Sequence, residues 1–166
     1  MSTHTRLVVL LLAAWVGGAP SMSFAQSNGA QTSRPPGGAA VDATAEVALL
    51  AMANDARADR HLPALRMSPT LRELAREHSR DMERRGYVGH DSPMGASFLD
   101  RLGAAFPPGT RVGENVTEVE TVEQANAVFL ASALHLRNII DPGFHTAGIG
   151  IVTTDEVMVV TEDFAQ

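Results

Sequence analysis

The sequence contains no cysteine and no lysine, and aromatic residues make up only 5% of it. The absence of cysteine excludes a disulfide framework, and it excludes a lipid anchor on an N-terminal cysteine. All 13 basic residues are arginines, against 19 acidic residues, and the net charge is −6 with the histidines neutral. Because the arginines are interleaved with acids, the sequence shows no basic patch of the kind that binds nucleic acid. We therefore expect no nucleic-acid partner.

Long hydrophobic runs are also absent. The apolar run at 7–16 has ten residues, which as a helix would span only about 15 Å, half of a bilayer core. It follows a short segment with one arginine and precedes small residues ending at Ala25. This order is typical of a secretory signal peptide at 1–25. We expect cleavage after Ala25, a mature chain without a transmembrane span, and a secreted or periplasmic location.

The rest of the chain divides into two parts. Residues 26–41 have almost no large apolar side chains and are predicted to form a flexible tether. Residues 42–166 are enough for one domain with its own hydrophobic core.

The periodicity of this domain places helices first and the clearest strands last. Asp42, Ser68 and Thr121 are predicted helix N-caps, and Gly86 is a predicted C-terminal stop. The predicted helices span 42–60, 68–86, 97–106 and 121 to a break at 141, and the predicted strands span 111–119, 147–153 and 157–164. This order predicts an α+β fold with helices packed on a small antiparallel sheet.

Three polar residues stand out as candidates for a functional site. Glu114 and Asn115 follow a glycine at the start of a predicted strand, where a carboxylate either pins a loop or belongs to a site. His90 lies in a Gly-His-Asp-Ser-Pro loop, and loops on a rigid scaffold often carry binding residues. His135 lies three residues after Ser132, on the predicted fourth helix. We predict that His90, Glu114 and His135 converge in one cleft, supported by Asn115 and Ser132.

Other polar residues are better explained by structure. His78 and Asn54 lie on the inward faces of predicted helices, where such side chains usually hydrogen-bond within the core. His61 and His145 lie at breaks between elements and have no further feature that indicates a site.

The spacing of the candidates does not identify a reaction. Two imidazoles and a carboxylate are the donors of a His₂Glu zinc site, but these three are far apart in sequence. The sequence contains no His-Glu-x-x-His, Gly-x-Ser-x-Gly or Walker motif. No serine has an evident base and orienting group, so no activated nucleophile can be assigned.

The ordered set of motifs resembles the CAP superfamily (cysteine-rich secretory proteins, antigen 5 and pathogenesis-related proteins) in its short bacterial form without cysteine. The motifs that carry the resemblance are Asn54 with Arg57, His78 with Asp81-Met82, His90-Asp91-Ser92-Pro93, Arg101, Gly113-Glu114-Asn115, Ser132 with His135 and Asn138, and Gly148-Ile149-Gly150.

The resemblance implies an α–β–α sandwich, with a small antiparallel sheet between helical layers. It also implies a cleft in which His90 and His135 hold zinc or another divalent metal while Glu114 orients an imidazole or a water. A second acid of the fuller family would fall near Ser132. Its absence predicts weaker metal binding, because residues that orient ligands contribute about 10–100-fold in affinity.

These features support several functions. The first is a binding module without catalytic activity, whose ligand is a small molecule, a lipid or an extracellular polymer. A metal-dependent hydrolase of envelope or extracellular polymer is the main alternative, with catalytic roles for His90, Glu114 and His135. A lipid or sterol carrier and a structural adhesin are also consistent with the resemblance.

Overall fold

A computed structural model of the protein describes residues 38–166. The predicted signal peptide and most of the predicted tether lie outside these residues. The elements in chain order are β1 (Ala40–Val41), α1 (Ala43–Ala58), β2 (Arg66–Met67), α2 (Pro69–Arg85), α3 (Phe98–Gly103), β3 (Val112–Val119), α4 (Val122–Ala131), α5 (Ala133–Ile139), β4 (Thr146–Thr153) and β5 (Met158–Ala165). Within this part of the chain, no helix is long and apolar enough to cross a membrane.

The helix ends follow the signals in the sequence. The Asp42 side chain accepts hydrogen bonds from the first turn of α1, and Ser68 does the same for α2. Gly86 ends α2 with a φ of 67°, in the left-handed region that glycine adopts without strain. Thr121 caps α4 by accepting from the N–H of Gln124. These caps satisfy N–H groups that have no partner inside the helix.

Two predicted boundaries are wrong. The single helix predicted from 121 to 141 is broken at Ser132, whose extended backbone ends α4 and whose hydroxyl caps α5 by accepting from the N–H of His135. Serine competes for backbone N–H groups in this way because its hydroxyl is short and close to the main chain. In addition, Ala40 and Val41 do not belong to a tether, because they form β1 and pair with β4.

The sheet has the strand order β1-β4-β5-β3, and β2 adds a short parallel pairing to β4. The β4–β5 hairpin is antiparallel over its full length, and β3 pairs antiparallel with β5. β3 therefore lies at one edge of the sheet. This position leaves its outer side open to the loops and helices that carry the candidate residues.

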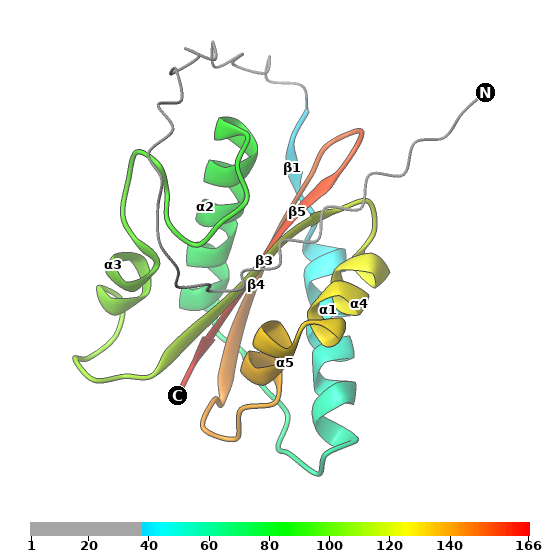
Figure 1. Ribbon diagram of the computed structural model, residues 1–166, viewed down its shortest axis with the longest axis vertical. Coiled ribbons are helices and arrows are strands. Elements are labelled where there is room, and N and C mark those ends of the chain that lie inside the picture. Colours follow the sequence, from blue (N-terminus) through cyan, green and yellow to red (C-terminus); the bar gives the residue numbers. More distant parts are fainter. Residues whose placement is uncertain (1–37) are drawn as a thin grey trace, which may run out of the picture. The chain divides into compact units, whose positions relative to one another are not determined.

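Helices cover both faces of the sheet (Figure 1). α2 packs on β4 and β5 on one face, with α3 beside it, whereas α1, α4 and α5 cover the other face. The structure thus confirms an α–β–α sandwich. Because neighbouring strand residues point to opposite faces, β4 and β5 must supply buried residues to both layers.

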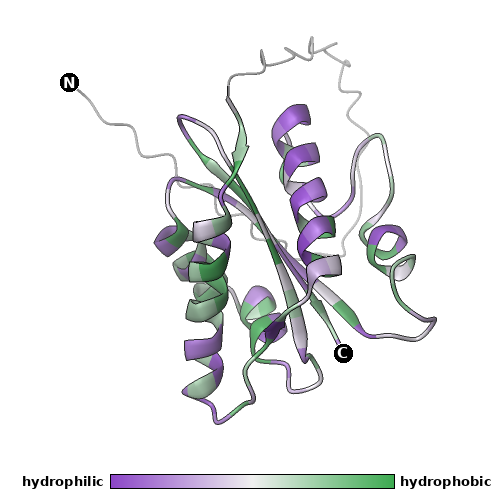
Figure 2. Cartoon of the chain, turned by 180° about the vertical axis from the view of Figure 1, so that it is seen from behind, coloured by the Kyte–Doolittle hydropathy of each residue, from purple (hydrophilic) through white to green (hydrophobic). Residues whose placement is uncertain are grey.

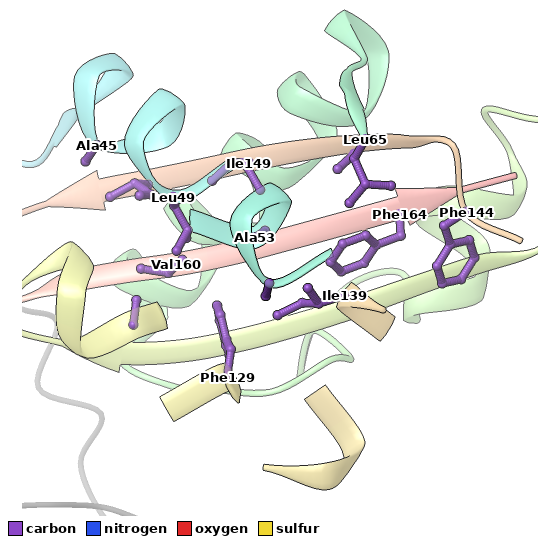
Figure 3. Packing of buried hydrophobic residues seen from close by; sticks show 14 residues of the cluster. Ala45, Leu49, Ala53, Leu65, Phe129, Ile139, Phe144, Ile149, Val160 and Phe164 are labelled. Carbon is purple, nitrogen blue, oxygen red and sulfur yellow. The ribbon is translucent and has the colours of Figure 1, made fainter. Parts of the chain in front are cut away.

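The larger core lies between the sheet and α1, α4 and α5 (Figure 3). Its fully buried members include Leu49, Phe129, Ile149 and Phe164. On the opposite face, smaller clusters form around Leu71 and Met82 of α2. Hydrophilic residues cover much of the outward side of α2, while the strands are mostly apolar (Figure 2).

Two glycines of β4 allow α2 to approach the sheet closely. A Cβ on Gly148 would lie 2.1 Å from the carbonyl carbon of Leu71, and one on Gly150 would lie 2.3 Å from that of Ala75. These neighbours are helix backbone atoms and cannot rotate away. α2 can therefore lie this close to β4 only because Gly148 and Gly150 have no side chains.

Gly148→Ala should lower the free energy of unfolding by about 1–3 kcal/mol or more, because the added methyl group overlaps the backbone of α2. Urea denaturation followed by circular dichroism measures this. The matched control is Gly103→Ala, because a Cβ there meets nothing within 4 Å. Equal stability of the two variants would contradict the close approach described here.

Candidate functional site

The candidate site is built around the first half of β3. Glu114 and Asn115 are adjacent in this strand, so their side chains point to opposite faces of the sheet. Glu114 faces α2 and α3, and Asn115 faces α5. Each is buried, and each contacts a different set of partners.

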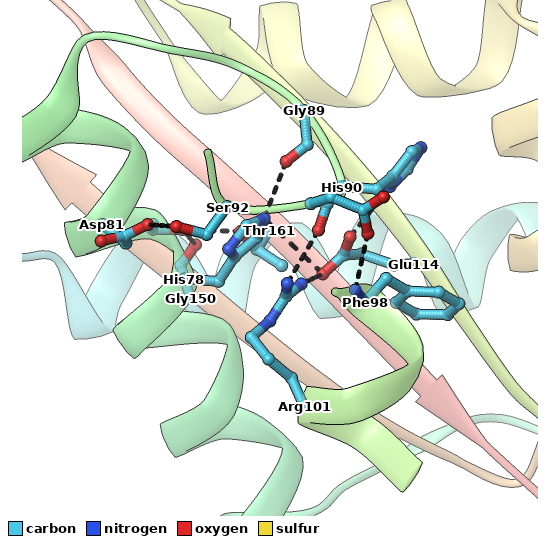
Figure 4. Close-up of polar contacts among 12 residues, drawn as sticks. His78, Asp81, Gly89, His90, Ser92, Phe98, Arg101, Glu114, Gly150 and Thr161 are labelled. Carbon is cyan, nitrogen blue, oxygen red and sulfur yellow. Dashed lines mark hydrogen bonds and ion pairs between the residues drawn. The ribbon is translucent and has the colours of Figure 1, made fainter. Parts of the chain in front are cut away.

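The carboxylate of Glu114 has 1% side-chain exposure and is held by side chains from three segments (Figure 4). Its Oε1 lies 2.8 Å from Nδ1 of His90. Its Oε2 forms an ion pair with Arg101 of α3 and lies 3.9 Å from Nε2 of His78. Glu114 is therefore a shared partner for one cation and two imidazoles.

His90 is the accessible member of this group. Its side chain is 52% exposed, and its backbone carbonyl accepts a hydrogen bond of 2.7 Å from Arg101. The hydrogen bond with Glu114 raises the pKa of His90. Since Nδ1 is turned to the carboxylate, Nε2 is the ring nitrogen left for a ligand.

His78 lies behind Glu114. It has 1% exposure, and its Nε2 donates to the carbonyl of Gly89 at 2.8 Å. Burial lowers the pKa of His78, which favours the neutral ring. This is the hydrogen-bonded core histidine expected from the sequence, but it lies close to the site. Asn54 likewise bonds backbone groups as expected, both the N–H and the carbonyl of Leu65.

Asn115 connects β3 to α5 on the other face. Its Nδ2 donates to the backbone carbonyl of His135 at 3.2 Å and to Oε2 of Glu162 at 2.9 Å. Asn138 of α5 donates back to the carbonyl of Glu114 and to Oδ1 of Asn115. These hydrogen bonds hold α5, and with it His135, against the strand that carries Glu114.

The ring of His135 is held by fewer polar contacts than the ring of His90. Its ring packs edge-on against Phe129 with 5.2 Å between centroids, and its buried Nδ1 has no hydrogen-bond partner among the described residues. Burial lowers the pKa of His135, and the nearby charge of His90 lowers it further. A positive charge on His90 therefore disfavours protonation of His135. Ser132 contributes a helix cap, by accepting from the backbone N–H of His135.

Two acids of β5 belong to this region, and sequence reasoning missed them. Asp163 is the cross-strand partner of Glu114, and Glu162 is that of Asn115. Burial and the neighbouring charge of Glu114 raise the pKa of Asp163 well above its usual range. Burial raises the pKa of Glu162 to about 7. The signal available in the sequence was a pair of adjacent acids, Glu162 and Asp163, inside the predicted strand 157–164.

The side chains of the site offer few donors to a metal. Among residues 38–166 there is no group of three or more His, Cys, Asp or Glu side chains placed to hold one ion. Glu114 is committed to His90 and Arg101. The orientation of His90 by a carboxylate is nonetheless what metal-ligating histidines usually have. A two-histidine metal site formed by His90 and His135 therefore stays a prediction.

Fold and site together define the class of protein. The model of the cysteine-rich secretory protein (CAP) family matches residues 50–164, and this chain belongs to that family.

Among its relatives is the protein YkwD of Bacillus subtilis (strain 168), 28% identical over 113 residues, which are 68% of this chain and 44% of YkwD. An extracellular protein of Bacillus anthracis that contains an SCP domain has 26% identity and a TM-score of 0.63, over 74% of this chain and 40% of that one. This chain therefore spans less than half the length of these two relatives.

A third similar structure is an outer surface protein of Borrelia burgdorferi. It has a TM-score of 0.71 and 16% identity, over 78% of this chain and 98% of that one. At this identity the similarity concerns the fold alone.

The raised pKa of Glu162 predicts a pH-dependent stability. Its pKa rises from 4.5 to about 7 on folding. The contribution of Glu162 to the free energy of unfolding is therefore complete below the unfolded-state pKa and is lost as the pH rises through the folded-state pKa. Glu162→Gln removes this titration and keeps an acceptor for Asn115. The variant should match the parent near pH ~4 and exceed it near pH ~8 by roughly 3 kcal/mol, at about 1.36 kcal/mol per pKa unit.

Urea denaturation at the two pH values measures the difference. Glu118→Gln, at an exposed glutamate of the same strand as Asn115, is the matched control for the change in net charge. A Glu162→Gln variant that gains nothing at high pH would show that Glu162 is not a buried, neutral acid.

Proposed function

We propose that this CAP domain is an exported binding module whose cleft, formed by His90, Glu114 and His135, takes a ligand through a divalent cation. Export is supported by the predicted signal peptide and by the similar Bacillus anthracis protein, which is described as extracellular. The ligand would be a small molecule, a lipid or an extracellular polymer.

The hydrogen bond between His90 and Glu114 is the observation that carries this proposal. A buried carboxylate fixes one nitrogen of an exposed imidazole, and so presents the other nitrogen in a defined direction. Fixing a ligating imidazole through its second nitrogen raises its basicity and reduces the cost of binding.

His90 and His135 would be the protein ligands of the cation. Zinc suits imidazole donors, and a site with two protein ligands keeps positions open for water or for a donor from the ligand. Because His135 has no carboxylate to orient it, we expect the affinity to be lower than in a site with two acids.

The contacts favour binding over hydrolysis. As a general base, Glu114 would need a free oxygen near an attacking water, but His90 and Arg101 take its two oxygens. The serines near the histidines are also committed, since Ser92 donates to Asp81 and Ser132 caps α5. Burial alone would raise the pKa of Asp81, but hydrogen bonds from Ser92, Arg85 and Tyr87 outweigh burial and lower the pKa to about 2, so this carboxylate is too weak a base to activate Ser92.

Isothermal titration calorimetry with zinc tests the proposal. Zinc should produce a saturable heat, and the His90→Ala, His135→Ala double variant should abolish it because both protein ligands are removed. His145→Ala is the matched control, since this exposed imidazole lies outside the cleft and its removal should leave the heat unchanged.

Absence of heat at millimolar zinc, or equal heat in the double variant, would remove the metal from the proposal. Mass spectrometry of the purified protein then distinguishes the remaining classes. A co-purified lipid would favour the carrier function.

A further inference from the structure

The outer side of the edge strand β3 carries backbone groups without a strand partner. β3 pairs with β5 along one side and with no strand of the described chain along the other. In an antiparallel pair, successive residues turn their N–H and C=O groups alternately toward the partner strand and away from it. The N–H of Gln166 donates to the carbonyl of Arg111, so the odd-numbered residues of β3 face β5. The even-numbered residues, from Val112 to Glu118, turn their backbone groups outward.

The outward groups beyond the cleft are open. The carbonyl of Glu114 is engaged, since Nδ2 of Asn138 donates to it at 3.0 Å. Among residues 38–166, no hydrogen bond reaches the backbone N–H or C=O of Val116 or of Glu118. These two residues therefore offer two donors and two acceptors directly next to the cleft residue Glu114. We call this part of β3, residues 116–118, the open edge.

β3 lacks most of the features that protect an edge strand from pairing. Such edges are usually blunted by a proline, a bulge or a lysine. The strand contains no proline and no basic residue, and its register with β5 is unbroken over all 8 residues. The side chain of Val116 belongs to the core cluster with Met82 and Val159. Glu118, which is exposed, is the only charged side chain of the open edge.

The surface that follows the open edge is acidic. Glu118, Glu120 and Glu123 are all exposed. None of them forms an ion pair with another residue of the described chain. The sequence contains no basic residue between Arg111 and Arg137 apart from His135. Unpaired negative charge along the edge favours a ligand that carries basic side chains.

A hollow of about 90 Å³ adjoins the open edge on the face covered by α2. Glu83 and Glu118 line it together with Arg84 and Arg85. Both arginines already contact the carboxylate of Asp81, so three carboxylates face two guanidinium groups. Alternate side chains of a strand added to β3 would point to this face, and the hollow can accept the end of one of them.

We propose that the open edge of β3 binds an extended basic peptide by strand addition. Val116 and Glu118 exchange backbone hydrogen bonds with the peptide, which is how exposed sheet edges recognise extended chains. The glutamates beyond them contact its basic side chains. The inference rests on the proposed function, because it names a peptide as the ligand of the cleft, but the pairing itself needs no cation.

Two other occupants fit the edge less well. A second copy of this chain would bring its own glutamates against the same edge, and like charges on opposed strands are destabilising. The predicted tether has a single charged residue, Arg34, which is followed by Pro35 and Pro36. Proline cannot donate to a strand ladder.

Amide hydrogen exchange, measured by NMR on the ¹⁵N-labelled protein, tests the proposal with a blocked hexapeptide of alternating valine and arginine. Without peptide, the amides of Val116 and Glu118 should exchange at least about tenfold faster than those of Asn115 and Thr117, which face β5. Saturating peptide should slow exchange at Val116 and Glu118 by about fivefold or more and leave Asn115 and Thr117 unchanged.

Two controls separate backbone pairing from attraction between charges. The same hexapeptide with every backbone amide N-methylated keeps its charge and loses its donors, so it should not bind. Glu118→Pro should weaken binding by about fivefold or more relative to Glu118→Ala, which removes the same charge but keeps the N–H. An edge strand tolerates proline where the N–H faces solvent. If Glu118→Pro unfolds the domain, the methylated peptide decides the question on the unaltered protein.

Equal binding of the methylated peptide, or equal affinities of two folded Glu118 variants, would overturn strand addition. A hexapeptide of alternating valine and glutamate that binds as tightly would overturn the preference for a basic ligand. Slow exchange of Val116 and Glu118 before peptide is added would also overturn the proposal, and its loss on dilution would identify a second copy as the occupant. The peptide titration contains no zinc and the zinc calorimetry contains no peptide, so the failure of one is distinguishable from the failure of the other.

Discussion

A carboxylate with 1% exposure is costly to bury unless charged or hydrogen-bonding partners compensate it, and Glu114 depends on such partners. Arg101 and His90 supply two of them, from α3 and from the loop that precedes it. Arg101 also donates to the carbonyl of His90, so the same guanidinium holds the carboxylate and the loop. Neutralising this buried charge is therefore one of the contacts that hold the 86–101 segment, beside the hydrogen bonds from Ser92 to Asp81 and from His78 to the carbonyl of Gly89.

The acids of β5 extend this polar interior across the sheet. Glu162 and Asp163 are adjacent and fully or almost fully buried, and they point to opposite faces next to Asn115 and Glu114. Burial raises the pKa of each, which makes the neutral form accessible at ordinary pH. A protonated acid is less costly to bury than a charged one, so the domain can keep polar groups beside its cleft without a full set of cations.

Much of the fold was predictable because local signals agreed with the tertiary structure. Asp42, Ser68 and Gly86 start or end helices as their chemistry dictates, and the alternating end of the chain forms the expected hairpin. The break at Ser132 was not predictable from periodicity, since the apolar pattern continues through it. There the serine hydroxyl competes successfully for a backbone N–H.

The candidate site was predictable in part. The pairing of His90 with Glu114 follows from the resemblance, but the partners that bury Glu114 come from distant segments. Arg101 appeared as a motif residue without a role, and Asp163 lay unremarked in the predicted strand 157–164. Strand register decides which residue faces which, and the sequence alone does not give the register of β3 against β5. The burial of both acids depends on that register.

The central claim is that Glu114 organises the 86–101 segment, and hydrogen–deuterium exchange in Glu114→Gln tests it most directly. The amide lacks the charge that holds Arg101 and His90, so backbone amides in 89–101 should exchange at least about tenfold faster, while β4 and β5 keep their protection. Unchanged exchange in 89–101 would contradict the claim. It would show that the segment is held by other contacts and that the buried carboxylate is not the organising charge of the site.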